Sequence, residues 1–192
     1  MRPPDEITVE LALPAAYDVR LLTEIPGHGG VDHIFARDDR IVDGGVLVEV
    51  VGGGGGWTGS VANGARSVAG AHSGVYSTPS PSTLCVVARG DAYLIDAESP
   101  ERWWVLEDSP VVTVRCMVAE KLLVFATPWR VIAVGEEGVA WRTSRIAIDG
   151  IALGEAVGGE LAGIADPDDD EAQDFVVELR TGHHRGGFPF PG

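Results

Sequence analysis

The sequence predicts an all-β fold built from antiparallel sheets, and three observations support this. Glycine and proline are frequent, with 26 and 12 copies among 192 residues, and many of them separate short apolar runs. Several of those runs alternate apolar and polar residues, as a strand with one solvated face does. No segment shows a sustained helical period, so we expect helix to be scarce.

The N-terminal region, residues 1–51, has an irregular β pattern. Turns are predicted at Pro26–Gly30 and Asp43–Gly45, where glycines cluster. The period-two runs Ile7–Leu13 and Val46–Val51 are the clearest strands. The strands predicted here are Ile7–Leu13, Tyr17–Ile25, Asp32–Arg37 and Val46–Val51.

Residues 52–82 change in composition and become rich in glycine, serine and proline. The small apolar content and the high entropy of such a segment predict a long loop or linker, with one short strand at Trp57–Val61. The five glycines Gly52–Gly56 are followed by neither the lysine of a phosphate-binding loop nor a helix. A flexible hairpin connection is therefore the favoured interpretation of the glycine run.

Residues 83–185 form the main antiparallel β region. Short turns such as Gly90–Asp91 and Gly158–Gly159 join neighbouring runs and indicate hairpins. The predicted strands are Leu84–Arg89, Ala92–Ile95, Arg102–Glu107, Val111–Val118, Leu122–Thr127, Arg130–Val134, Val139–Thr143, Ile151–Val157, Glu160–Ala165 and Phe175–Arg180.

The C-terminal residues 186–192 alternate phenylalanine and proline, which excludes a central strand. This extended tail either docks on the body of the protein or frays as a free terminus. All the regions together are expected to form one structural domain, because the length of the chain suits one domain or two closely joined pieces.

A repeat of about 40 residues recurs in the main β region. Its members are Ala88–Asp96, Ala126–Val134, and a third stretch in which Phe175–Leu179 follows Ala165 after an acidic insert. Each has a strand that ends in alanine, then a turn, then an apolar strand. The spacing predicts sheets that resemble propeller blades, with a β-sandwich as the alternative.

Over residues 83–185 these features resemble a fragment of a β-propeller of the quinoprotein or WD-repeat type. A second pattern is also similar to small bacterial all-β proteins, a resemblance that implies no activity; it consists of Trp141-Arg142-Thr143, Asp149-Gly150, Gly158-Gly159 and Thr181-Gly182. Three units cannot close a propeller, which normally has 4–8 blades. A fourth irregular blade from the N-terminal region, an open sandwich, and closure by self-association all remain open.

Charge and composition exclude several partners and indicate a compartment. The net charge of −15 repels phosphate backbones and anionic membranes, so we expect neither nucleic acid nor membrane as a partner. No apolar run approaches ~18 residues, and the start Met1–Glu6 lacks a signal-peptide pattern. Cys85 and Cys116 are expected to be reduced, as in the cytoplasm. One lysine beside thirteen arginines suggests a GC-rich bacterial genome.

No catalytic residue, metal site or cofactor is predicted, because each candidate motif fails on spacing. The cluster Asp166–Asp174 lacks the glycine and glutamate positions of a calcium-binding loop. The stretch Gly70–Gly74 does not match the nucleophile elbow of a serine hydrolase. The histidines show no zinc-site spacing; they are His28, His33, His72, His183 and His184.

Tryptophan and arginine at strands and turns are the candidate binding residues, since both are enriched in interface hot spots. The candidates are Trp103, Trp104, Trp129, Arg130 and Trp141; large residues of the core are the competing interpretation. We therefore expect a non-enzymatic binding or protein-interaction module that recognises a protein partner or self-associates. The alternative is a hydrolase in which the 52–82 loop covers a site with His28, His33 or His72 as the base.

Overall fold

The computed structural model describes residues 7–25, 27, 30–37, 44–64 and 70–190. Within these residues the protein is all-β, without an α-helix, and its strands form four mostly antiparallel sheets. None of the four sheets closes into a barrel. The predicted fold class is confirmed, and the arrangement is consistent with blade-like units or with sandwiched sheets.

The chain divides into two compact units, Met1–Pro110 and Val111–Gly192. The sequence predicted one domain, with regions that end at residues 51, 82 and 185, and the boundary after Pro110 coincides with none of them. The predicted boundaries followed changes in composition, whereas the units follow which sheets share a hydrophobic core.

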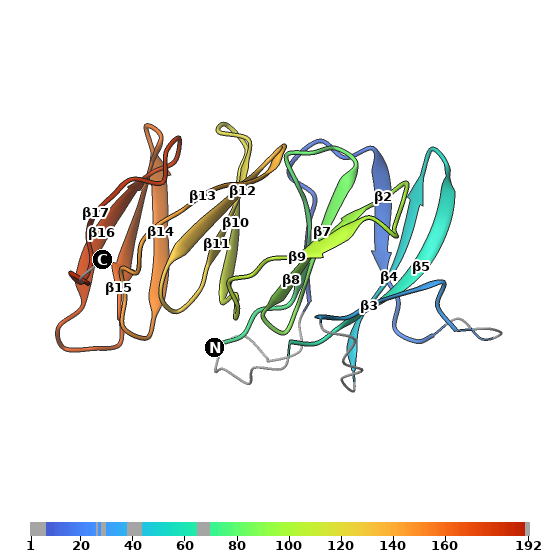
Figure 1. Ribbon diagram of the computed structural model, residues 1–192, viewed down its shortest axis with the longest axis horizontal. Helices are drawn as coiled ribbons and strands as arrows, with labels where there is room; N and C mark the ends of the chain where they lie inside the picture. The colour runs from blue at the N-terminus through green and yellow to red at the C-terminus, as the bar shows by residue number, and fades with distance from the viewer. Residues whose placement is uncertain (1–6, 26, 28–29, 38–43, 65–69, 191–192) are drawn as a thin grey trace. The chain divides into compact units, whose positions relative to one another are not determined.

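Unit 1 contains two sheets (Figure 1). Its strands are β1 (Thr8–Glu10), β2 (Tyr17–Leu21), β3 (His33–Phe35), β4 (Gly45–Gly52), β5 (Gly55–Ala62), β6 (Gly74–Ser77), β7 (Thr83–Ala88), β8 (Asp91–Asp96) and β9 (Trp103–Val105). Sheet I has the order β2-β4-β5-β3 and sheet II the order β1-β6-β7-β8-β9. Neighbouring strands are antiparallel, except that β3 lies parallel to β5 and β1 parallel to β6.

Unit 2 contains two regular four-stranded sheets, each an antiparallel meander (Figure 1). The strands of sheet III are β10 (Thr113–Met117), β11 (Leu122–Ala126), β12 (Val131–Gly135) and β13 (Gly138–Arg142). Those of sheet IV are β14 (Ile151–Val157), β15 (Glu160–Ala165), β16 (Gln173–Glu178) and β17 (His184–Gly186). Every strand pairs with its neighbour in sequence, so the first and third hairpins of a sheet lie at one end and the second at the other.

The predicted repeat falls on corresponding strands of three sheets. Strands β8, β12 and β16 begin at Asp91, Val131 and Gln173, which are 40 and 42 residues apart. Each is the third strand of its meander, counted from β6, β10 and β14. Sheet I, the fourth sheet, combines β2, β3 and β4 with β5 from the 52–82 segment, and its strand order departs from the sequence order.

Each unit has a hydrophobic core between its two sheets. In unit 1, alternate residues of β4 (Val46, Val48 and Val50) are buried and cluster with Leu84 and Val86 of β7. Burying such a side chain contributes about 1.5–3 kcal/mol.

In unit 2, Val124 of β11 clusters in the same way with Leu161 of β15 and with Phe175 and Val177 of β16. The period-two alternation noted in the sequence therefore stabilises each pair of sheets face to face.

Two tryptophans link the paired sheets by equivalent hydrogen bonds. The indole nitrogen of Trp57, on β5, donates to the carbonyl oxygen of Ala97, just beyond β8, at 2.8 Å. The indole nitrogen of Trp141, on β13, donates to the carbonyl oxygen of Leu179, just beyond β16, at 2.7 Å. In each unit the bond connects a strand of one sheet to the residue that follows the third meander strand of the facing sheet. Both tryptophans are only 8% exposed.

Within residues 52–82 the predicted short strand Trp57–Val61 is present as part of β5, but the described part of this segment also contains β6 and is not one long loop. Strand β5 pairs with β4 from Gly52↔Gly55 to Gly45↔Ala62, and β6 pairs with β7. The glycine run is a hairpin connection, as expected. Gly59 sits inside β5 because a Cβ there would lie 2.9 Å from a ring carbon of Phe35. Glycine at position 59 thus leaves room for the packed aromatic rings and does not serve to make the strand flexible.

The C-terminal tail docks on unit 2 as far as residue 190. The amide of Phe188 donates to the carbonyl oxygen of Ile146 at 2.9 Å, and its side chain packs against the unit 2 core. The guanidinium carbon of Arg145 lies 4.7 Å from the centre of the Phe190 ring. Of the two alternatives for this segment, docking is confirmed for the described residues.

His28, most of the predicted turn Pro26–Gly30 and the first residue of the predicted turn Asp43–Gly45 lie outside the described residues. Along the described ranges no helix has the length and apolar character needed to cross a membrane. Cys85 is buried and Cys116 half-buried, and neither forms a disulfide.

Candidate functional site

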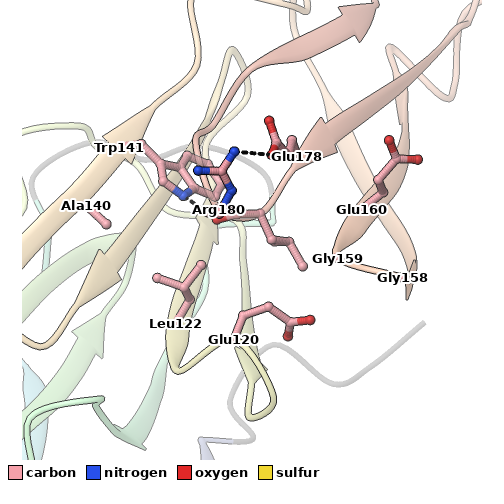
Figure 2. A pocket seen from close by; sticks show the side chains of 10 residues that line it. Glu120, Leu122, Ala140, Trp141, Gly158, Gly159, Glu160, Glu178 and Arg180 are labelled. Atoms are coloured by element: carbon pink, nitrogen blue, oxygen red, sulfur yellow. Dashed lines mark hydrogen bonds and ion pairs between the residues drawn. The ribbon is translucent and has the colours of Figure 1, made fainter.

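A hollow of about 660 Å³ opens between sheets III and IV at the tips of their hairpins (Figure 2). We call it the tip hollow. It is lined by Glu120, Leu122, Ala140, Trp141, Gly158, Gly159, Glu160, Glu178, Leu179 and Arg180. Its volume lies in the range of small-molecule and side-chain binding sites in proteins.

Antiparallel alternation brings the lining residues to one end of unit 2. Glu120 lies in the β10–β11 turn, Gly158 and Gly159 in the β14–β15 turn, and Arg180 just beyond β16. These are the first and third hairpins of their meanders, so they face the same end (Figure 1). Gly158 and Gly159 have φ values of 61° and 82°, the left-handed conformation that a two-residue hairpin turn requires.

The base of the tip hollow is apolar. Leu122 and Trp141 are each 8% exposed, and Leu179 is fully buried. The Trp141 ring is held by its bond to the Leu179 carbonyl oxygen and by close contact with Gly182, where a Cβ would lie 2.7 Å from the ring atom Cδ2. The indole is therefore fixed in orientation before any ligand arrives.

The rim carries three glutamates and one arginine. Glu160 forms a two-pronged ion pair with Arg185 at 2.7 and 2.8 Å. Glu178 accepts a hydrogen bond from the Thr181 hydroxyl at 2.6 Å and one from Arg180 at 3.2 Å.

The pKa values of both of these glutamates are lowered by their hydrogen-bond partners. The Arg185 hydrogen bond lowers the pKa of Glu160 below its ordinary value. The pKa of Glu178 is lowered chiefly by the Thr181 hydrogen bond, with a smaller contribution from Arg180. These hydrogen bonds therefore favour the charged form of Glu160 and Glu178.

Glu120 differs from the other two rim glutamates. It is exposed at the β10–β11 tip, and no described residue forms an ion pair or hydrogen bond with it. It is thus the rim glutamate without an ion pair in the described chain, and the exposed Lys121 follows it in the sequence.

Of the five predicted binding residues, Trp141 alone lines the tip hollow. Trp103 and Trp104 lie on β9 in unit 1 and are 36% and 38% exposed. Adjacent residues of a strand point to opposite faces, and Trp103 packs on Phe35 and Tyr93, with ring centres 5.8 and 6.0 Å apart.

Trp129 and Arg130 lie in the β11–β12 turn, at the opposite end of sheet III from the tip hollow. The Thr127 hydroxyl oxygen accepts both of their backbone amides, at 3.2 and 3.1 Å. The carbonyl oxygen of Trp129 in turn accepts the amide of Ile146. The structure therefore places this pair in a well-ordered turn and does not bring it to Trp141.

The glutamates of the rim were missed in the sequence because they stand in a turn (Glu120) or at strand ends beside turns (Glu160 and Glu178), where charged residues usually have no role beyond solvation. A signal was present for Glu160, because the predicted hairpin at Gly158–Gly159 places it beside a turn. The hairpin after Glu178 depends on β17, a strand that the sequence did not predict.

Of the histidines named as candidate bases, His33 and His72 lie in unit 1 beside aromatic side chains, and neither lines the tip hollow. His33 packs on Phe35 and Trp57, and the His72 ring nitrogen Nε2 hydrogen-bonds the Tyr76 hydroxyl. Outside the prediction, the Ser144 hydroxyl lies 2.8 Å from Nε2 of His184. The buried Nδ1 of that ring has no hydrogen-bond partner among the described residues, although a catalytic serine needs an oriented histidine.

The acidic cluster Asp166–Asp174 contains a structural carboxylate. The buried Asp166 side chain accepts the backbone amides of Ile148 and Asp149 at 2.8 and 2.6 Å. These bonds tie the segment after sheet III to the turn after β15. In the part of the chain that the structure describes, no group of three or more acidic, histidine or cysteine side chains could hold a metal ion.

Comparisons with known proteins identify no family. No protein-family model matches the chain, and no curated protein matches it. Among solved structures, a chain from the S. cerevisiae structure of Dbp5 bound to Nup159, Gle1, IP6 and ADP aligns with 13% identity and a TM-score of 0.44. The alignment covers 96% of this chain and 52% of that one, so this chain spans about half of its length. A similarity at this level carries no argument about function.

Proposed function

We propose that the protein is a non-enzymatic interaction module of the bacterial cytoplasm that binds a polypeptide segment in the tip hollow. One observation carries the proposal. A fixed tryptophan and two leucines form the base of an open hollow, and charged side chains ring it. An apolar centre with a polar rim is the usual anatomy of a protein-interaction site.

The position of the tip hollow supports a binding role. Its walls are hairpin tips supported by two packed sheets, so the lining residues sit on a rigid framework. Recognition by loops on a β scaffold needs no change in the core. The apolar base would bury apolar surface of the bound segment, and the charged rim would orient that segment and select among partners.

Interaction is a better account than hydrolysis on two grounds. The lid predicted at residues 52–82 contains strands β5 and β6 instead of a long loop. The Ser144–His184 pair does not line the tip hollow, and within the described chain nothing accepts a hydrogen bond from His184 Nδ1. A serine nucleophile would lack the group that orients its base.

The proposal is tested by placing a photo-crosslinking amino acid at Ala140, an exposed residue of β13 that lines the tip hollow. Ala162 is the matched control, because it is an exposed alanine of β15 in the same unit but lies outside the lining. Both proteins are irradiated in extract of the native cell, and adducts are identified by mass spectrometry.

We expect a discrete polypeptide adduct from position 140 that is weaker or absent from position 162. An adduct between two copies of this chain would make the partner a second copy and would still support an interaction module. The same adducts from both positions, or none from position 140, would contradict the proposal.

A further inference from the structure

The tip hollow combines an apolar base with carboxylates at its rim, and this combination suits one kind of side chain. Leu122 and Trp141 form the base, while Glu120, Glu160 and Glu178 stand around it (Figure 2). Lysine and arginine have an aliphatic stem that covers apolar surface and a charged head that stays at a polar edge. A neutral apolar side chain would contact the base and leave the Glu120 carboxylate without a partner.

We infer that the tip hollow takes a cationic side chain, arginine or lysine, from the bound polypeptide. This inference rests on the proposed function and adds the chemistry of the ligand. The stem lies over Leu122 and the Trp141 ring, and the cationic head meets the Glu120 carboxylate at the rim.

Glu120 is the group that decides the sign of the ligand charge. Arg185 already occupies Glu160 through two hydrogen bonds, and Arg180 and Thr181 both bond Glu178. Glu120 has no ion pair within the described chain. A carboxylate beside an apolar surface that partly excludes water attracts a cation more strongly than one in open solvent.

An anionic ligand fits the tip hollow less well. The one cation of the lining, Arg180, is held by Glu178 at 3.2 Å. An anion would have to displace that carboxylate while it approached Glu120 and Glu160. The net charge of −15 opposes an anion over the whole surface and favours the approach of a cation.

The test uses the full chain and two short probes, acetyl-Gly-Arg-Gly-amide and the same peptide with citrulline in place of arginine. Citrulline keeps the shape of arginine and removes its charge. The protein has five tryptophans, and labelling them with ¹⁵N gives indole signals that report on each ring in one NMR titration.

We expect the Trp141 indole signal to shift saturably with the arginine peptide, and the citrulline peptide to bind at least about fivefold more weakly. Glu120→Gln should weaken arginine-peptide binding about threefold to fivefold, the range for one exposed ion pair. Glu171→Gln is the matched control, because Glu171 is exposed in the β15–β16 turn at the other end of sheet IV. It should leave the affinity unchanged.

Equal binding of the two peptides, or unchanged affinity in Glu120→Gln, would overturn the inference of a cationic ligand. A shift at Trp103, Trp104 or Trp129 without one at Trp141 would overturn it as well. None of these results removes an adduct from position 140, so failure of this inference is distinguishable from failure of the proposed function.

Discussion

Trp57 and Trp141 have the same role in the two units, although the sequence around them differs. Each is almost buried, and each donates its indole N–H to a carbonyl oxygen of the opposing sheet, at 2.8 and 2.7 Å. A buried indole nitrogen without an acceptor costs free energy, so a bond that also joins two sheets has a structural value beyond packing. Trp141 is in addition the centre of the tip hollow.

Replacing either of these tryptophans by phenylalanine should lower the free energy of unfolding. The ring volume falls and the opposing carbonyl oxygen loses its donor, so we expect a loss of about 2–3 kcal/mol in Trp57→Phe and in Trp141→Phe. Urea denaturation followed by circular dichroism measures it. Trp104→Phe is the control, because Trp104 is 38% exposed, and it should cost less than about 1 kcal/mol. Equal losses in all three variants would contradict the role assigned to the indole bonds.

The ion pair of Glu160 with Arg185 predicts a dependence of stability on pH. The folded-state pKa of Glu160 is lowered from its ordinary value of 4.5, so its contribution is present above about pH 4.5 and disappears as the pH falls through the lowered value. The melting temperature of Glu160→Gln should therefore approach that of the wild type as the pH falls from 6 to 3. Melting curves of both proteins across this pH range measure the difference in melting temperature. A difference that widens on acidification would contradict the prediction.

At the residue scale, the sequence predicted part of the tip hollow. Trp141 was identified because tryptophan is enriched in binding sites, but that argument alone also selected Trp129, which the β11–β12 turn places at the other end of sheet III. Residue type therefore suggests which residues bind a partner, whereas strand direction decides which of them lie close together in the fold. Glu120 and Glu178 became identifiable only when the hairpins were assigned to an end of the meander.

Among the elements, the hairpin tips of unit 2 depend on glycines for two different reasons. Gly158 has a φ of 61° and open space around its Cα, whereas Gly182 has a φ of 72° and lies against the Trp141 ring. Both positions need the left-handed conformation. Gly182 alone also needs the absence of a side chain.

Alanine substitutions at the two positions should separate these reasons. We expect Gly158→Ala to cost about 1–2 kcal/mol, from the backbone conformation alone. Gly182→Ala should cost roughly 2–4 kcal/mol, because a Cβ there would lie 2.7 Å from the indole and add an overpacking term. Denaturant unfolding of both variants provides the comparison. A cost at Gly158 equal to that at Gly182 would mean that the ring contact has no energetic weight.

The elements that the sequence missed are those in which apolar alternation is weak or hidden. Strand β17 (His184–Gly186) contains no large apolar residue, so only its pairing with β16 defines it. Strand β6 (Gly74–Ser77) lies in a segment rich in glycine and serine, although Val75 and Tyr76 are buried. Most strands predicted between residues 83 and 185 are present within a few residues of the predicted ends, because their buried residues are plainly apolar.

For the whole molecule, the dominant long-range property is the net charge of −15. Self-repulsion of this size opposes the compact state and is reduced by added salt. The same charge opposes the binding of a phosphate backbone, so we expect none unless a basic patch concentrates enough arginines.

We therefore predict a melting temperature that rises between about 20 and 500 mM sodium chloride, as screening shortens the range of the repulsion. We also predict no binding of a fluorescently labelled DNA duplex at about 50 mM salt, where cationic contacts would be strongest. Differential scanning fluorimetry and fluorescence anisotropy measure the two properties. Duplex binding that weakens steeply with salt would reveal a basic surface and contradict the expectation.

The central claim, that the tip hollow is the binding site, is tested most directly by hydrogen–deuterium exchange on the intact protein with and without the polypeptide captured at position 140. The account predicts slower exchange at the tips that form the hollow, residues 118–121, 158–159 and 179–183. Slower exchange confined to β9 or to the 127–130 turn, with no change at those three tips, would contradict it.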